Sequence, residues 1–340
     1  MEIESAYLGI RLREGDKMFN TMIEKLKANP PKLVFTEGSD PRILEAASRL
    51  KQEKILEPLL LGNMEEINEA SKKYRFSIEG IETMDPENYP EMDSMAAKLV
   101  EIRKGKLDEA EARELLKKTN YFGTMLVQLG YAYGLLGGAT YSTADTVRPA
   151  LQIVKTKPGN HIVSSCFIMH RETEIGDERY AMADCAININ PSADELVEIA
   201  LESAKTARIF SIEPKVAMLS YSSLGSGKGE SVDKVREAVQ KLKAIHPDFP
   251  IDGELQFDAA FSPEVAKTKA ADSPVAGQAN TFIFPDINAG NIGYKIAQRL
   301  GGFEAYGPIL QGLNAPINDL SRGCNAEEVY KMAIITACMK

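Results

Sequence analysis

The sequence predicts an α/β protein of two domains, each built on a mostly parallel β-sheet that is covered by helices. Short apolar runs alternate along the chain with segments in which apolar residues recur at helical spacing. That order is typical of strands joined by covering helices. The length of 340 residues corresponds to two domains rather than one. Because the alternation stops near Pro158 and then resumes, the second domain is expected to begin there.

The first part of this pattern has clear start and stop signals. Lys32–Thr36 is apolar and rich in β-forming residues, as in a buried strand. A helix is expected directly after it, because Asp40 is a good capping residue and Pro41 suits the first helical position. A second strand at Pro58–Leu61 and a second helix at Asn63–Tyr74 follow.

The part after Pro158 repeats the alternation up to the last residues of the sequence. Its first two strands are expected to be neighbours. In chain order the predicted elements are strands at His161–Met169 and Arg179–Asn188, a helix from Ser192 or Asp194 to Ile209, a strand at Lys215–Tyr221, a helix at Val232–Ile245, a strand at Asn280–Phe284, a helix at Asn288–Leu300, a short strand at Pro308–Leu310 and a closing helix at Asn325–Cys338.

Two stretches are the best candidates for passages between the domains, Thr156–Asn160 for the crossing and Gly301–Gly307 for the return. We therefore assign residues 1–158 and 308–340 to a discontinuous first α/β domain. Residues 159–307 are assigned to a second α/β domain inserted into the first, with a cleft between the two.

Composition excludes several classes of protein. The chain is 44% hydrophobic and 26% charged, as in folded globular proteins rather than disordered ones. A formal net charge of −9 argues against nucleic acid as a partner, because the phosphate backbone would be repelled. No signal peptide is recognisable, and the most apolar stretch, Thr124–Tyr141, is shorter than the roughly 20 residues of a spanning helix. A cytoplasmic location without membrane contact is expected.

The cysteines and histidines do not predict a metal site. The four cysteines are widely spaced without a CxxC pair, and the three histidines form no HExxH motif. Reduced, structural thiols are the expected state in a cytosolic protein.

Two glycine-containing segments are candidate ligand loops. Leu224–Gly229 lies between a predicted strand and a helix, but Gly229 follows Lys228 where a P-loop has serine or threonine. A surface turn is therefore favoured over a nucleotide cradle. In Gly137–Pro149, small residues allow close approach of a ligand, and Ser142 or Thr143 either caps the next helix or helps to bind an anion there.

Reactive groups are densest in Asn318–Asn325. Arg322 can hold a phosphate through two hydrogen bonds, and the neighbouring Ser321 can donate to a developing negative charge. Glu328 follows seven residues after Ser321 and could act as a general base. It also fits a capping box, in which it would accept from the backbone N–H of Asn325. Chemistry alone favours the capping role, and both roles stay open.

The run Gly307–Cys324 resembles the C-terminal signature of the phosphate acetyltransferase (phosphate acetyl/butyryltransferase) family. Four further segments are similar to that family in the same order: Tyr121–Met125, Ser142–Pro149, Ala183–Ile189 and Gly290–Lys295. The resemblance extends from about Lys32 to the end of the sequence. The first fifteen residues lie outside it and are expected to be an extension or a vector remnant.

This resemblance implies reversible transfer of an acetyl group between coenzyme A and inorganic phosphate. Coenzyme A, acetyl phosphate and phosphate would be the small-molecule partners, with coenzyme A as a substrate rather than a bound cofactor and with no metal. The family also implies a fold like that of isocitrate and isopropylmalate dehydrogenases, an active site in the cleft between domains, and a homodimer.

Site residues follow from the resemblance position by position. Arg322 matches the arginine that binds the phosphoryl group, Ser321 the serine that stabilises the transition state, and Glu328 the proposed base, where the family commonly has aspartate. The remaining matches are to substrate-binding positions. These are Arg148 and Arg103 for phosphate and coenzyme A, with Ser142, Thr143 and Tyr294 lining the cleft near acetyl phosphate.

Three other functions remain open at this stage. A phosphate butyryltransferase would share the fold and most motifs, because one methylene changes specificity by only about 1–3 kcal/mol. A metal- and nicotinamide-dependent hydroxy-acid dehydrogenase would need metal-binding aspartates and a dinucleotide site, and neither motif is evident. A catalytically silent homologue is disfavoured by the presence of Ser321, Arg322 and Arg148.

Overall fold

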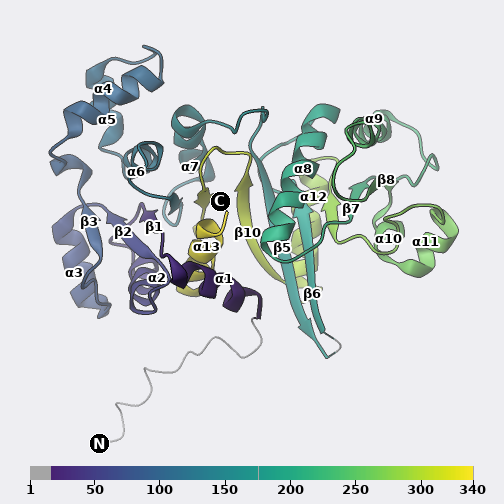
Figure 1. The fold of residues 1–340 in the computed structure, drawn as a ribbon, viewed down its shortest axis with the longest axis horizontal. Coiled ribbons are helices and arrows are strands. Elements are labelled where there is room, and N and C mark those ends of the chain that lie inside the picture. Colours follow the sequence, from purple (N-terminus) through teal and green to yellow (C-terminus); the bar gives the residue numbers. More distant parts are fainter. Residues whose placement is uncertain (1–16, 175, 340) are drawn as a thin grey trace, which may run out of the picture.

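The computed structural model of the chain describes residues 17–174 and 176–339 (Figure 1). The first fifteen residues, which are expected to be an extension and show no recognisable signal peptide, lie outside the described part of the chain. The described chain forms two β-sheets that lie side by side, with helices packed on their faces (Figure 1). This α/β architecture with mostly parallel pairing confirms the predicted fold class. None of the described helices is long and apolar enough to span a membrane.

The first sheet is fully parallel, with the order β11-β4-β1-β2-β3. The chain runs from β1 outward to β3 and then returns to place β4 on the other side of β1. Connections from β1 and β4 therefore lead to opposite sides, and such a switch point opens a crevice at the carboxyl ends of the strands. The strands are β1 (Lys32–Phe35), β2 (Glu57–Leu61), β3 (Glu82–Met84), β4 (Gly134–Gly137) and β11 (Ile317–Asp319).

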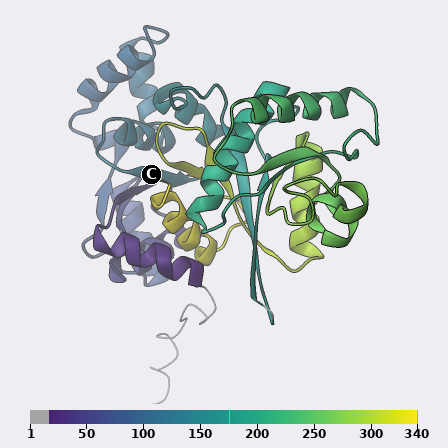
Figure 2. The same ribbon diagram turned by 45° about the vertical axis from the view of Figure 1, so that its right-hand side comes forward.

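Helices cover both faces of this sheet because alternate strand residues point to opposite sides. Leu33 and Phe35 belong to the apolar cluster formed with α1, α2, α3 and α13, whereas Val34 belongs to the cluster formed with α4, α5 and α6. Helices α1 and α13 lie side by side although they come from opposite ends of the chain (Figure 2). The helices are α1 (Lys17–Ala28), α2 (Pro41–Gln52), α3 (Met64–Tyr74), α4 (Met92–Ile102), α5 (Glu109–Leu116), α6 (Thr119–Gln128), α7 (Thr143–Pro149) and α13 (Ala326–Ala337).

The second sheet is mixed, with the order β10-β5-β6-β9-β7-β8. β5 and β6 form the antiparallel hairpin whose strands the sequence places next to each other, and the pairs β6–β9, β9–β7 and β7–β8 are parallel. Helices α8 and α9 pack on one face and α10, α11 and α12 on the other. The elements are β5 (Ser164–Thr173), β6 (Gly176–Ala183), α8 (Ala193–Ile209), β7 (Val216–Leu219), α9 (Glu230–Ala244), β8 (Ile251–Leu255), α10 (Phe257–Phe261), α11 (Pro263–Lys269), β9 (Thr281–Ile283), α12 (Ile287–Arg299) and β10 (Glu304–Gln311).

The chain passes twice between the sheets, and the two passages are hydrogen-bonded to each other. The backbone N–H of Lys157 donates to the carbonyl of Gly312 at 2.8 Å, and that of Asn314 donates to the carbonyl of Lys155 at 3.0 Å. The strand expected at Pro308–Leu310 is longer than predicted and belongs to the second sheet as β10. The division of the chain at residues 158 and 308 stays a prediction.

Candidate active site

The residues of the predicted signature meet other loops at the carboxyl edge of the first sheet. β1, β4 and β11 are neighbouring parallel strands, so the segments that follow them leave the sheet at the same edge. These segments begin at Thr36, Gly138 and Leu320. We call the loop after β11, Leu320–Cys324, the signature loop. The backbone N–H of Leu320 donates to the carbonyl of Gly137 at 2.7 Å, which fixes the start of this loop beside the end of β4.

A cavity of about 420 Å³ opens next to this edge. Its wall includes Ser321, Cys324 and Glu328 from the first sheet's side and Tyr294 of α12 from the second sheet's side. Of the eight predicted site residues, the cavity thus brings together Ser321, Glu328 and Tyr294. The other five lie outside its lining and are described below.

Tyr294 forms an aromatic wall of the cavity. Its ring stacks on Phe167 of β5, with ring centroids 4.0 Å apart and an angle of 13° between the planes. Burial raises the pKa of the Tyr294 hydroxyl, so this side chain is a neutral hydrogen-bonding group at ordinary pH.

Ser321 and Arg322 are exposed at the edge of the cavity. The Ser321 hydroxyl oxygen accepts from the backbone N–H of Gly323 at 3.2 Å, which leaves its own proton available to donate. Among the described residues, the Arg322 guanidinium has no acidic partner, although the Arg322 carbonyl accepts from Arg42 at 2.9 Å. An unpaired guanidinium beside a hydroxyl is suited to hold an anion such as phosphate.

Arg148 and Arg103 both lie near Tyr121, although 45 positions separate them in the sequence. Burial raises the pKa of Tyr121, and the positive charges of Arg148 and Arg103 both oppose that shift, so both arginines lie near this phenol. Neither forms an ion pair with a described acidic residue, and Nε of Arg103 is buried without a hydrogen-bond partner. A buried donor without a partner is stabilised when an anion accepts its hydrogen bond.

Ser142 and Thr143 stand at the start of α7, as predicted, but their hydroxyls do not cap its backbone. Ser142 Oγ donates to Asp145 Oδ2 at 2.7 Å, and Thr143 Oγ1 donates to Asp319 Oδ2 at 2.6 Å. Thr146 donates to the other oxygen of Asp319 at 2.6 Å. This carboxylate therefore joins α7 to the end of β11, two residues before Ser321.

The capping role predicted for Glu328 is confirmed. Its backbone N–H donates to Asn325 Oδ1 at 2.9 Å, and its carboxylate accepts from the backbone N–H of Asn325 at 3.2 Å. Glu328 nevertheless remains exposed and lines the cavity. Capping and contact with a ligand are therefore compatible at this position.

Three residues at this edge escape the sequence prediction. Asp319 is buried in the cavity wall, and burial raises its pKa. Glu37 accepts from the backbone N–H groups of Gly138 and Thr140, and burial raises its pKa as well. Arg42 is bonded to the signature loop from α2. Of the three, only Asp319 carries a local signal, because it belongs to the reactive cluster around Ser321.

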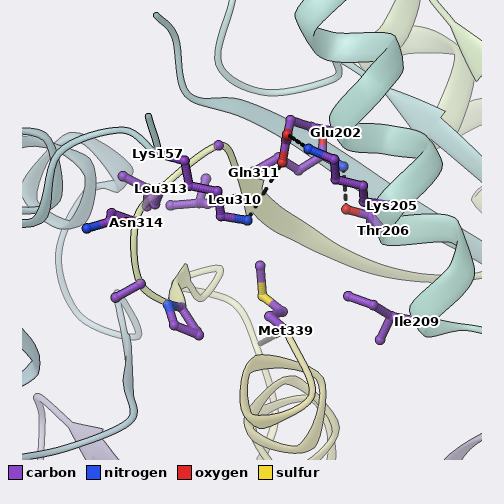
Figure 3. Close-up of a pocket in the computed structure, with 13 residues that line it drawn as sticks. Lys157, Glu202, Lys205, Thr206, Ile209, Leu310, Gln311, Leu313, Asn314 and Met339 are labelled. Carbon is purple, nitrogen blue, oxygen red and sulfur yellow. Dashed lines mark hydrogen bonds and ion pairs between the residues drawn. The ribbon is translucent and has the colours of Figure 1, made fainter. Parts of the chain in front are cut away.

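A second cavity of about 270 Å³ lies between α8 and the passage that follows β10 (Figure 3). Gln311 donates to Thr206 Oγ1 at 2.6 Å there, and Lys205 is paired with Glu202. None of the predicted site residues lines it, so we place the candidate active site at the larger cavity. Among the described residues, no three His, Cys, Asp or Glu side chains are grouped as ligands for a metal ion.

Fold and site together define a two-sheet α/β protein with a cavity at the carboxyl edge of a parallel sheet, next to the exposed guanidinium of Arg322. Residues 17–337 match the family model described as phosphate acetyl/butaryl transferase, and the chain belongs to this family, as the sequence motifs predict.

Its similarity to individual members extends over almost the whole chain. It is 55% identical to a phosphate acetyltransferase of Bacillus subtilis over 320 residues, covering 94% of this chain and 98% of the relative. A phosphotransacetylase from Streptococcus pyogenes has a similar structure, with a TM-score of 0.91, 56% identity and coverage of 94% of this chain and 97% of the other. A Staphylococcus aureus phosphotransacetylase gives a TM-score of 0.87 at 49% identity, with the same coverage of both chains.

Proposed function

We propose that this chain is a phosphate acetyltransferase, which reversibly transfers an acetyl group between acetyl phosphate and coenzyme A. The observation that carries the proposal is the cavity shared by Ser321, Glu328 and Tyr294, in a chain that resembles phosphate acetyltransferases over 94% of its length. The enzyme class is an acyltransferase with coenzyme A as a substrate and no bound cofactor or metal. Cytoplasmic location, a homodimer and the inserted second domain belong to the same proposal.

In this mechanism Glu328 removes the proton from the coenzyme A thiol. A thiol with a pKa near 8.5 is only about one part in thirty ionised at pH 7, so complete ionisation is worth roughly 2 kcal/mol. The thiolate sulfur attacks the acetyl carbonyl carbon and forms the C–S bond. The bond between that carbon and the bridging oxygen breaks, and phosphate leaves with the electron pair of that bond.

Ser321 and Arg322 stabilise the charges that develop in this step. The Ser321 hydroxyl donates to the carbonyl oxygen as it becomes negative, and the exposed, unpaired guanidinium of Arg322 holds the phosphoryl oxygens. Arg148 and Arg103 supply further positive charge for phosphate and coenzyme A. This local charge is required because the chain as a whole carries a net charge of −9 and repels anionic substrates at long range.

Thr143, Ser142 and Tyr294 complete the substrate-binding side of the proposal. Thr143 is held by Asp319, and Tyr294 by its stacking on Phe167, so both side chains are fixed before substrate arrives. A fixed site of this kind lowers the entropic cost of orienting two substrates.

The test is thioester formation from coenzyme A with acetyl phosphate and, in parallel, with butyryl phosphate, followed by thioester absorbance. We expect turnover that favours acetyl phosphate. A preference for butyryl phosphate would keep the mechanism and change the substrate, and no turnover with either would contradict the proposal.

Ser321→Ala tests the assigned chemistry directly. Loss of one oxyanion donor typically lowers kcat by about 10²–10³-fold, and we expect a loss of this size. The matched control is Ser94→Ala, which removes an exposed hydroxyl on α4 outside the candidate site and should leave the rate unchanged. Near-normal turnover of Ser321→Ala would refute its role.

A further inference from the structure

We propose that Arg42 is a positioning residue, which holds the Ser321–Cys324 loop in its active geometry by tying it to the loops that follow β1 and β4. This inference rests on the proposed function for its readout. The N–H groups of Arg42 are already bonded to protein oxygens, so it acts through Ser321 and Arg322 rather than on the substrate.

The guanidinium of Arg42 is first fixed to its own helix. Asp40 caps the N-terminus of α2 and accepts from the backbone N–H of Arg42 at 2.9 Å. The same carboxylate accepts from Arg42 Nε at 3.0 Å and from Arg42 Nη2 at 2.8 Å, a two-point ion pair. Although burial opposes ionisation, the hydrogen bonds from Arg42 hold the pKa of Asp40 below its usual range. The direction of the arginine side chain is thereby set before it reaches any other segment.

The remaining N–H groups of Arg42 reach two other loops. Nη1 donates to the carbonyl of Arg322 at 2.9 Å and to the carbonyl of Cys324 at 3.1 Å, while Nη2 donates to the carbonyl of Ala139 at 2.9 Å. A guanidinium carries five N–H donors in a planar fork, and here five oxygen acceptors surround it. The loops after β1, β4 and β11 therefore meet at one side chain.

Both ends of the reactive turn depend on this contact. The carbonyls of Arg322 and Cys324 flank Gly323, so fixing both sets the path of the backbone through the turn. The direction of the Ser321 and Arg322 side chains follows from that path. A misplacement of about 1 Å can cost roughly 10²-fold in rate. Lysine cannot replace Arg42, because an ammonium group lacks the planar fork that reaches all these acceptors.

The experiment compares Arg42→Ala and Arg42→Lys with Arg49→Ala in the thioester assay. Arg49 is a matched control on the same helix, because it joins α2 to α13 rather than to the Ser321–Cys324 loop, through an ion pair with Glu327 at 2.6 Å and stacking on Tyr330. We expect kcat to fall by about 10–100-fold in both Arg42 variants with a smaller change in KM. Arg49→Ala should keep kcat within about threefold, even where its stability falls. Added guanidinium ion at millimolar concentration should restore part of kcat in Arg42→Ala only.

The outcomes separate this inference from the proposed function. No thioester formation by the unaltered chain would refute the function itself. If the unaltered chain is active, an unchanged kcat in Arg42→Lys would refute the positioning role, and so would equal losses in the Arg42 and Arg49 variants without rescue. Should Arg42→Ala fail to fold, the kcat and KM of Arg42→Lys decide the question alone.

Discussion

The two roles of Glu328 can be separated by substituting the two partners of its capping box. Glu328→Gln keeps a side-chain oxygen that can accept from the Asn325 N–H but removes the carboxylate that would take a proton. Asn325→Ala removes the cap and leaves the Glu328 carboxylate in the cavity wall. If Glu328 is the base, the first variant loses rate and the second loses stability.

The expected magnitudes differ enough to distinguish the roles. The hydrogen bond to the Asn325 N–H is exposed and 3.2 Å long, so its change in Glu328→Gln should cost no more than about 0.5–1 kcal/mol of unfolding free energy. Loss of a general base typically lowers kcat by about 10²–10⁴-fold. Asn325→Ala should lower the unfolding free energy by about 1 kcal/mol, the usual value of an N-cap.

Two measurements on each variant are sufficient: urea unfolding for stability and thioester formation for kcat. Unchanged kcat in Glu328→Gln would refute the catalytic role and leave only the cap. A loss of more than about 10²-fold in Asn325→Ala would show that the position of the helix terminus, rather than the carboxylate itself, controls the rate.

Three further predictions concern residues around the signature loop. Gly138 has φ +100°, and a Cβ there would overlap Asp319 Oδ1. Gly138→Ala should therefore lower the unfolding free energy, measured by urea unfolding, by about 1–3 kcal/mol or more. Burial raises the pKa of Asp319 above 3.8, so its contribution to stability is complete below that pH and is lost as the pH rises through the raised value. Asp319→Asn should flatten this dependence, and parallel stability curves would contradict the argument. Burial raises the pKa of Cys324 to about 11. Alkylation of Cys324 by iodoacetamide at pH 8, followed by mass spectrometry, should therefore be about 100-fold slower than that of free cysteine. Cys324→Ser should keep kcat within about tenfold.

Local signals in the sequence were sufficient where a helix begins at a predicted N-cap, whereas α1, α4, α5, α6, α10 and α11 were not predicted. Asp40, Ser192 and Asn325 occupy the predicted N-cap positions and accept from the expected backbone N–H groups. Capping depends on residues two or three positions apart, so it can be recognised without knowledge of the tertiary structure.

Several strands were not predicted because distant partners satisfy their polar groups. The sequence of β8 contains Asp252 and Glu254, and two acidic residues so close together are typical of a polar turn. In the structure both side chains are buried. Lys243 donates to Asp252 at 2.7 Å, and Ser222 donates to Glu254 at 2.9 Å. β10 was predicted too short, because Gly307 and Pro308 interrupt its apolar pattern and coincide with an irregular register against β5. β4 and β11 are short and were hidden within glycine-rich and signature motifs.

The candidate site was predicted only in part, because some of its contacts join segments that are far apart in the sequence. Motif resemblance indicated Ser321, Glu328 and Tyr294, which the structure brings to one cavity. It could not indicate Arg42, since the carbonyls that Arg42 contacts lie 280 and 282 positions away in the sequence. Backbone acceptors also carry no residue-type signal, so only the fold shows this contact.

The signature loop is fixed at both ends while its reactive side chains are exposed between them. At its start, Asp319 accepts from Thr143 and Thr146 of α7, and at its end Arg42 holds the carbonyl of Cys324. Groups held in this way need little reorganisation as charge develops, which is the condition under which oxyanion donors are most effective. Tyr294, in contrast, reaches the same cavity from the second sheet. The shape of the cavity therefore depends on the position of the second sheet as well as on the fixed loop.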